Sequence, residues 1–169
     1  MRRVCVLLTA LGAIGAVALS IVVEPPRILL WNASASVPVG LYALDATDRR
    51  YVSELVAVIP PEPLATFLAD GNYLPRGIPL LKHVLALPGQ TVCRDGLMVT
   101  VDTVATGVAR ERDARGRPLP TWHGCRAIGL GELFLMNWQS ADSLDGRYFG
   151  PIPASAVIGR AHRVWTKED

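Results

Sequence analysis

The sequence is poor in lysine and cysteine and has no long block of one charge. Its 17 basic and 15 acidic residues leave a formal net charge of +2 at pH 7. Nucleic-acid-binding domains gather lysine and arginine into basic patches. This even distribution therefore argues against nucleic acid as a partner. The three cysteines do not have the spacing of a zinc finger, so we expect no metal site and no cofactor.

The motif G-x-S-x-G, which presents a nucleophilic serine on a strand-to-helix turn, is also absent. The chain has three histidines, His83, His123 and His162. Each could serve as the base of a Ser-His-Asp triad, but isolated histidines are more often structural or exposed to solvent. The sequence thus disfavours a histidine-based triad.

One long segment lacks both charge and proline. Residues 4–23, VCVLLTALGAIGAVALSIVV, would span about 30 Å as a helix, which is the thickness of the hydrocarbon core of a bilayer. Two arginines precede it, so the positive-inside rule predicts residues 1–3 in the cytoplasm and residues 24–169 on the far side. We expect a single-pass anchor; the alternative is a cleaved signal peptide, because the small residues at 16–18 form an acceptable cleavage site.

This topology bears on the cysteines. Cys93 and Cys125 would face an oxidising compartment, where a disulfide persists, whereas Cys5 would lie in the membrane. Two separate buried thiols are the alternative. We expect a Cys93–Cys125 disulfide.

After the anchor, short runs rich in β-forming residues alternate with glycine and proline. Their length and composition predict one mainly β domain of barrel or sandwich type. A helix is expected over residues 63–69, and the polar stretch 109–124 is expected to be a long hairpin loop with its charges in water. Residues 27–31 could form a strand or an interfacial segment. The expected strands lie within residues 40–44, 55–60, 79–87, 96–102, 132–137 and 156–165.

Lysine occurs only twice, and its scarcity makes each position informative. Lys167 belongs to the terminal TKED, which we expect to be solvated. Lys82 lies in an apolar strand and would share a face with Leu80 and Val84. Burial lowers the pKa of a lysine, and a neutral lysine can act as general base toward a serine hydroxyl. Alternatively, the stem covers apolar surface while the ammonium reaches water.

Four segments occur in the order found in type I signal peptidases, the membrane-anchored Ser-Lys endopeptidases. They are SASVPVGLY (34–42), KHVLALPGQTV (82–92), GELFLMN (131–137) and SLDGRYFGPIPASAVIGRA (143–161). The chain resembles this family from the anchor to about Trp165. It is most similar to the TraF-like branch, which matures conjugative pilin precursors. The resemblance implies a signal-peptidase-like β-barrel or sandwich behind one N-terminal transmembrane helix.

The resemblance also implies a role for each matching residue. Ser36 matches the nucleophile, and Lys82 matches the general base. Ser34 matches the position whose hydroxyl joins the Ser36 backbone N–H in an oxyanion hole, where preorganised donors stabilise the tetrahedral intermediate. Two departures from the family pattern are His83, where arginine is usual, and Gln90, where aspartate is usual.

Further matching residues would brace the site. Ser143 and Asp145 match the segment that orients the lysine, and Arg147 is the natural ion-pair partner of Asp145. Taken alone, Ser143 and Asp145 could equally cap a local turn. Pro38 and Gly40 are expected to confine the chain after the nucleophile to a turn that displays its hydroxyl.

These features predict a serine endopeptidase that cleaves leader or pilin precursor segments at the outer surface of the bacterial inner membrane. Its partners would be precursor proteins and the lipid bilayer, with the catalytic domain in the periplasm; the oligomeric state is open. An acyl-enzyme could yield either hydrolysis or, if a substrate amine attacks, a cyclic pilin. The alternatives are a non-enzymatic, membrane-anchored β-rich assembly factor of a pilus or secretion system, and a secreted soluble hydrolase.

Overall fold

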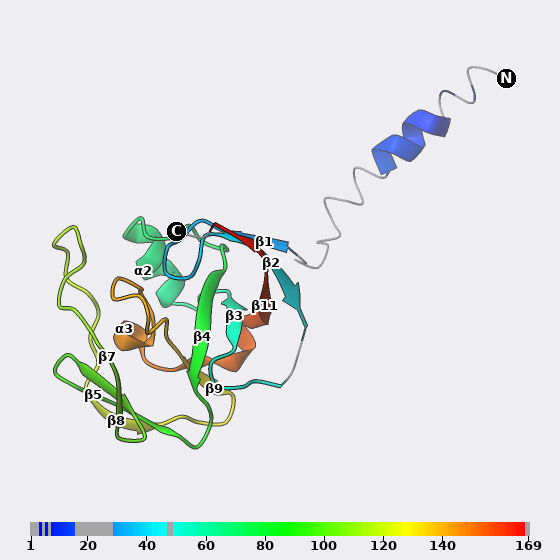
Figure 1. Ribbon diagram of the computed structural model, residues 1–169. Helices are drawn as coiled ribbons and strands as arrows, with labels where there is room; N and C mark the ends of the chain where they lie inside the picture. Colours follow the sequence, from blue (N-terminus) through cyan, green and yellow to red (C-terminus); the bar gives the residue numbers. More distant parts are fainter. Residues whose placement is uncertain (1–3, 5, 7, 16–28, 47–48, 168–169) are drawn as a thin grey trace.

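The computed structural model describes residues 4, 6, 8–15, 29–46 and 49–167. Residues 8–15 are helical and appear in blue in Figure 1. Within these described ranges, no helix is long and apolar enough to cross a membrane. Residues 5, 7 and 16–23 of the anchor expected over residues 4–23 lie outside the described residues.

The rest of the described chain forms a mainly β domain, as predicted (Figure 1). The larger sheet has the order β1-β2-β11-β3-β4-β9-β10, the smaller one has the order β7-β6-β5-β8, and all neighbouring strands are antiparallel. The strands are β1 (Leu29–Asn32), β2 (Gly40–Asp45), β3 (Leu55–Val58), β4 (Leu80–Ala86), β5 (Thr91–Asp95), β6 (Met98–Val101), β7 (Val104–Val108), β8 (Gly124–Ala127), β9 (Glu132–Leu135), β10 (Ile152–Pro153) and β11 (Val157–Thr166).

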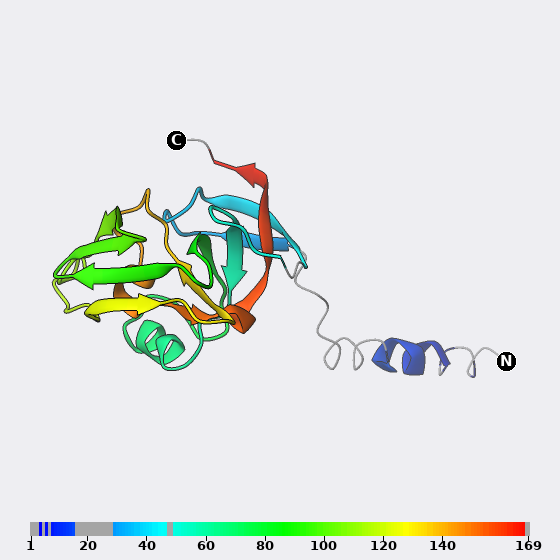
Figure 2. The same cartoon turned by 90° about the horizontal axis from the view of Figure 1, so that it is seen from below.

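The two sheets share a hydrophobic core. Side chains of β4, β5, β6 and β9 meet there, and the β5–β8 sheet packs beside the β4–β9 end of the larger sheet (Figure 2). The buried residues of this cluster are Ala86, Val92, Val99, Val101, Ile128, Phe134 and Met136. No ladder joins β1 to β10 within the described residues, so the larger sheet is open and not a closed barrel.

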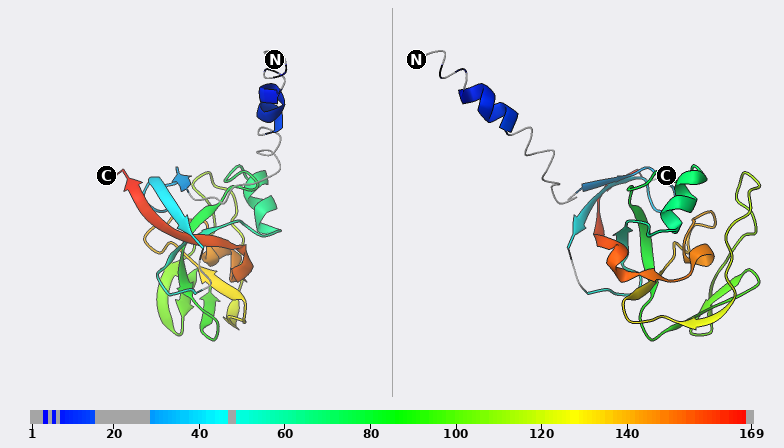
Figure 3. Two further views of the ribbon diagram at one scale, coloured as in Figure 1. Left: turned by 90° about the vertical axis from the view of Figure 1, so that its right-hand side faces the viewer. Right: turned by 180° about the vertical axis from the view of Figure 1, so that it is seen from behind.

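The two α-helices of the β domain lie close together (Figure 3). They are α2 (Leu64–Asp70), which confirms the expected helix, and α3 (Gly146–Phe149), followed by a 3₁₀ turn, η1 (Ala154–Ala156). Phe67 of α2 contacts Phe149 of α3 edge to face, with ring centroids 5.7 Å apart. This contact connects α2 to the segment that carries Ser143 and Asp145.

The long hairpin loop predicted over residues 109–124 is confirmed at its tip, where Arg112 and Pro118 form an antiparallel bridge and the Leu119 N–H donates to the Glu111 carbonyl at 2.9 Å. The strands that flank the loop, however, are not partners. This loop does connect β7 to β8, but β7 pairs with β6 and β8 pairs with β5, at opposite edges of the smaller sheet. Its charges are also not simply in water. Asp113 accepts a hydrogen bond of 2.6 Å from the Tyr73 hydroxyl and pairs with Arg117, which ties the loop to the end of α2.

Candidate active site

Ser36 lies in a tight turn of the loop between β1 and β2, and Asn32 holds this loop together. The Asn32 side-chain amide donates to the carbonyls of Ser34, Val37 and Pro38 at 2.7, 3.1 and 3.1 Å. Its side-chain oxygen accepts the Ser34 backbone N–H at 3.1 Å. Asn32 is therefore a central support of the loop. The sequence pattern did not single it out, because an asparagine after a strand is common in any turn.

The loop is also fixed to the core on the C-terminal side of Ser36. Val37 is 4% exposed and packs with Tyr42, whose hydroxyl donates to the Pro38 carbonyl at 2.6 Å. Gly40 was expected to lie in the turn after Ser36. It is instead the first residue of β2. A Cβ at Gly40 would come within 2.1 Å of the Trp165 carbonyl oxygen, so the close approach of β11 requires glycine there.

Ser34 and Ser36 contact each other directly. The Ser34 hydroxyl donates to the Ser36 Oγ at 3.1 Å and accepts the Ser36 backbone N–H at 3.3 Å. In this state the Ser36 N–H is thus bonded to the Ser34 oxygen, and the Ser34 O–H is bonded to the Ser36 Oγ. A substrate oxygen would replace these internal hydrogen bonds.

Lys82 lies in the middle of β4 between β3 and β9, and its side chain is only 4% exposed. Its Nζ donates to the Ser143 Oγ at 2.6 Å. Burial lowers the pKa of Lys82 from 10.5 to about 8, while the carboxylate of Asp145 acts in the opposite direction and Arg147 adds to the lowering. With this pKa about a tenth of the Lys82 amine is neutral at pH 7, and the neutral amine is the form that general-base chemistry requires.

Asp145 and Arg147 form an ion pair that is almost completely buried. Arg147 Nε and Nη2 donate to the two carboxylate oxygens of Asp145 at 2.9 Å each, in a bidentate arrangement. Arg147 also donates to the carbonyls of Ser140 and Ser143 at 2.7 and 3.1 Å. The pair shapes the backbone that presents the Ser143 hydroxyl to Lys82.

Asn137 connects this ion pair to the lysine strand, a role that was not predicted from its place in the sequence. Its backbone N–H donates to Asp145 at 3.1 Å, and its side-chain amide donates to the Leu81 carbonyl at 3.0 Å. Its side-chain oxygen accepts the His83 backbone N–H at 3.1 Å. Asn137 is fully buried and contacts the residues on both sides of Lys82. Its position at the end of the predicted strand 132–137 was the available signal.

Four of the predicted site residues line one cavity of about 620 Å³. Ser34, Ser36, Lys82 and Ser143 all line it, together with apolar side chains that include Leu80. In the part of the chain that the structure describes, no hydrogen bond joins Ser36 and Lys82. The Lys82 amine donates to the Ser143 hydroxyl. Catalytic hydrogen bonds are often long before substrate binds. Among the described residues, no group of three or more His, Cys, Asp or Glu side chains could hold a metal ion.

The structure contains the expected Cys93–Cys125 disulfide. The two cysteines are direct cross-strand partners on β5 and β8. The bridge lies in the smaller sheet and does not line the cavity that Ser36 shares with Lys82.

Comparisons with known proteins place this chain among peptidases. Residues 1–166 match the family model described as signal peptidase, peptidase S26. The chain is 36% identical over 146 residues to the conjugal transfer protein TraF of Agrobacterium fabrum, covering 80% of this chain and 81% of that protein. It is 36% identical over 145 residues to a probable conjugal transfer protein TraF of Sinorhizobium fredii, covering 80% and 76%. A crystal structure of a signal peptidase I from Enterococcus faecalis aligns with 68% of this chain and 98% of its own, at 15% identity and a TM-score of 0.41.

Proposed function

Because this chain belongs to the signal peptidase family, peptidase S26, we propose that it is a serine endopeptidase with Ser36 as nucleophile and Lys82 as general base. The observation that carries the proposal is the cavity that both Ser36 and the buried Lys82 line. A lysine of lowered pKa beside an accessible serine hydroxyl suits acyl transfer without histidine.

The proposed reaction begins with attack of the Ser36 Oγ on the carbonyl carbon of the scissile peptide bond. Lys82 takes the hydroxyl proton, and the Ser34 hydroxyl and Ser36 N–H stabilise the oxyanion. The C–N bond then breaks, and Lys82 returns the proton to the departing amine. Water activated by Lys82 hydrolyses the resulting ester. Ser143 keeps the Lys82 amine oriented during these steps, through the 2.6 Å hydrogen bond.

We further propose that the substrates are leader-bearing or pilin-like precursors used in conjugation. Support comes from the relatives, which are named as conjugal or plasmid transfer proteins. An anchor over residues 4–23, in the bacterial inner membrane, would hold the catalytic domain at the periplasmic surface and raise the local concentration of membrane-held precursors. Hydrolysis and cyclisation share the same acyl-enzyme and differ only in whether water or a substrate amine attacks it.

Trapping the acyl-enzyme tests the proposal. After acid quenching of the full chain with a precursor peptide, we expect mass spectrometry to find the acyl fragment attached to Ser36. Fragmentation of the tryptic peptide distinguishes Ser36 from Ser34. The Ser34→Ala variant should give the same adduct about 100-fold more slowly, because it loses one oxyanion donor. An adduct on Ser34, or none on any serine while the peptide is cleaved, contradicts the assignment.

The pH dependence of cleavage tests the base separately. Lys82 is active only when neutral, and its pKa is lowered to about 8 by burial. The value of kcat/KM should therefore rise with pH and reach half its maximum near pH 8. His83 would give a different result, because burial holds the pKa of its imidazole below 6.5. If kcat/KM instead reached half its maximum at or below pH 6.5, His83 would be identified as the base.

A further inference from the structure

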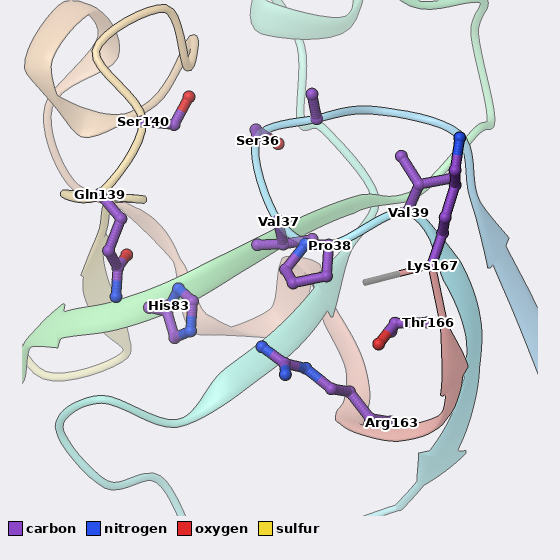
Figure 4. Close-up of a pocket in the computed structure, with 11 residues that line it drawn as sticks. Ser36, Val37, Pro38, Val39, His83, Gln139, Ser140, Arg163, Thr166 and Lys167 are labelled. Carbon is purple, nitrogen blue, oxygen red and sulfur yellow. The ribbon is translucent and has the colours of Figure 1, made fainter. Parts of the chain in front are cut away.

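A second pocket, of about 670 Å³, opens on the other side of Ser36 (Figure 4). It shares Ala35 and Ser36 of the nucleophile loop, and Gln139 and Ser140 of a distant segment, with the first cavity. Lys82 and Ser34 do not line it. Its lining residues are Ala35, Ser36, Val37, Pro38, Val39, His83, Gln139, Ser140, Arg163, Thr166 and Lys167. None of them is acidic.

Two cations line this pocket, and both come from the end of β11 and the residue after it. Arg163 lies opposite Tyr42 in the β2–β11 pairing, and its side chain extends toward His83 in Figure 4. The Lys167 backbone N–H donates to the Val39 carbonyl at 2.8 Å, which fastens this residue beside the nucleophile loop. Neither cation has an ion-pair partner among the described residues.

The surroundings keep Arg163 close to the nucleophile loop. Burial raises the pKa of the Tyr42 hydroxyl and the charge of Arg163 acts against this rise, so the guanidinium is near that hydroxyl. Tyr42 in turn donates to the Pro38 carbonyl, two residues after Ser36. His83 forms a neutral polar wall, since burial lowers the pKa of its ring and its Nδ1 lies 3.0 Å from the Asn137 side-chain oxygen.

The direction in which a substrate lies follows from the oxyanion donors. The scissile carbonyl must reach the Ser34 hydroxyl and the Ser36 N–H, and Ser34 lines only the first cavity. The residue that carries this carbonyl therefore binds in the first cavity. The chain beyond the scissile bond leaves Ser36 on the opposite side, into the pocket that contains Arg163.

We propose that this second pocket binds a carboxylate side chain within the first three residues after the scissile bond, through Arg163. The enzyme then prefers precursors with aspartate or glutamate in the departing segment. This inference rests on the proposed peptidase function. It adds a specificity determinant outside the Ser-Lys chemistry.

Paired peptide substrates test the inference. For each of the three positions after the cleavage site, one peptide with Asp is compared with one that has Asn there and is otherwise identical. The assay uses the full chain in zwitterionic micelles. At one position we expect kcat/KM to be about fivefold higher for Asp, the size of one solvent-accessible ion pair. In Arg163→Gln this ratio should fall to about one, and in Arg163→Lys it should largely persist. Salt at about 1 M should also reduce it.

The ratio of the two peptides is independent of how much enzyme is folded, so a partly misfolded variant still reports on specificity. Arg115→Gln removes an exposed arginine outside the pocket and should keep the wild-type ratio. Ser36-dependent cleavage with a wild-type ratio of one at all three positions overturns the inference and leaves the peptidase function intact. Absence of any cleavage overturns both. An effect of Arg163→Gln seen only with anionic lipid vesicles, and not with acidic peptides, would assign the pocket to a lipid phosphate and overturn the proposal.

Discussion

Replacing Lys82 with methionine is expected to lower kcat/KM for precursor cleavage by about 10³-fold, the usual contribution of a positioned base. Methionine has a similar length and no proton-accepting nitrogen, so it fills the site between β3 and β9 without a cavity. Purified full chain in micelles, assayed with a precursor peptide, provides the measurement. Leu81→Met is the matched control, because it conserves volume at the adjacent buried position and should change activity little.

The same Lys82→Met substitution should make the domain more stable at pH 7. The pKa of Lys82 is about 8 in the folded protein and 10.5 ordinarily, so the unfolded chain binds the proton more tightly. Folding is therefore disfavoured below about pH 8, by about 3 kcal/mol, and this cost disappears as the pH rises toward 10.5. Since methionine loses the hydrogen bond to Ser143, we expect a net gain of about 1–3 kcal/mol in the free energy of unfolding.

Urea unfolding of the two proteins at pH 7 and pH 10.5 measures this difference. The stability gain should be present at pH 7 and absent at pH 10.5. If the Lys82→Met variant cleaves as fast as wild type, Lys82 is not the general base. A variant that is less stable than wild type at both pH values contradicts a costly buried amine.

Arg147→Met should destabilise the domain by about 3–5 kcal/mol, because it leaves the Asp145 carboxylate buried without its partner. The side chains are 2% and 0% exposed, so water cannot replace the guanidinium. The variant also loses the hydrogen bonds to the carbonyls of Ser140 and Ser143. Cleavage should fall as well, since the backbone that presents Ser143 to Lys82 is no longer held.

Arg126→Met is the matched control for this prediction. Arg126 also pairs with a carboxylate, Glu132, but its own side chain is 51% exposed. Exposed pairs contribute about 0–1 kcal/mol. Chemical denaturation of both variants gives the comparison, and equal losses of stability would mean that burial of the Asp145–Arg147 pair has no special cost.

Several local features could be predicted from single segments. The strands around residues 40–44, 79–87 and 156–165 were visible because β-forming composition and glycine or proline punctuation are properties of neighbouring residues. The burial of Lys82 was left open, because the same apolar strand also fits a lysine whose stem covers apolar surface while its ammonium reaches water. The structure decides for burial. The short strand β7 was missed because its sequence, VATGV, contains glycine and is mostly exposed.

The supports of the site could not be predicted in this way. Asn32 and Asn137 look like ordinary turn residues, and their roles depend on carbonyls that other segments present to them. Lys167, expected to be only a solvated terminal residue, is exposed but lines a pocket beside Val39. These roles arise from strand pairing and not from composition.

The sequence by itself determined the mainly β class and, through four ordered segments, the candidate residues Ser36 and Lys82. Only the tertiary structure decided that Ser143 holds the Lys82 amine, that the Asp145–Arg147 pair is sealed from water, and that Arg163 lies beside the nucleophile loop. The physical reason is the separation along the chain over which each interaction acts. Alternation and propensity act between adjacent residues, whereas the β2–β11 register that aligns Tyr42 with Arg163 is set by how distant strands pack around a common core.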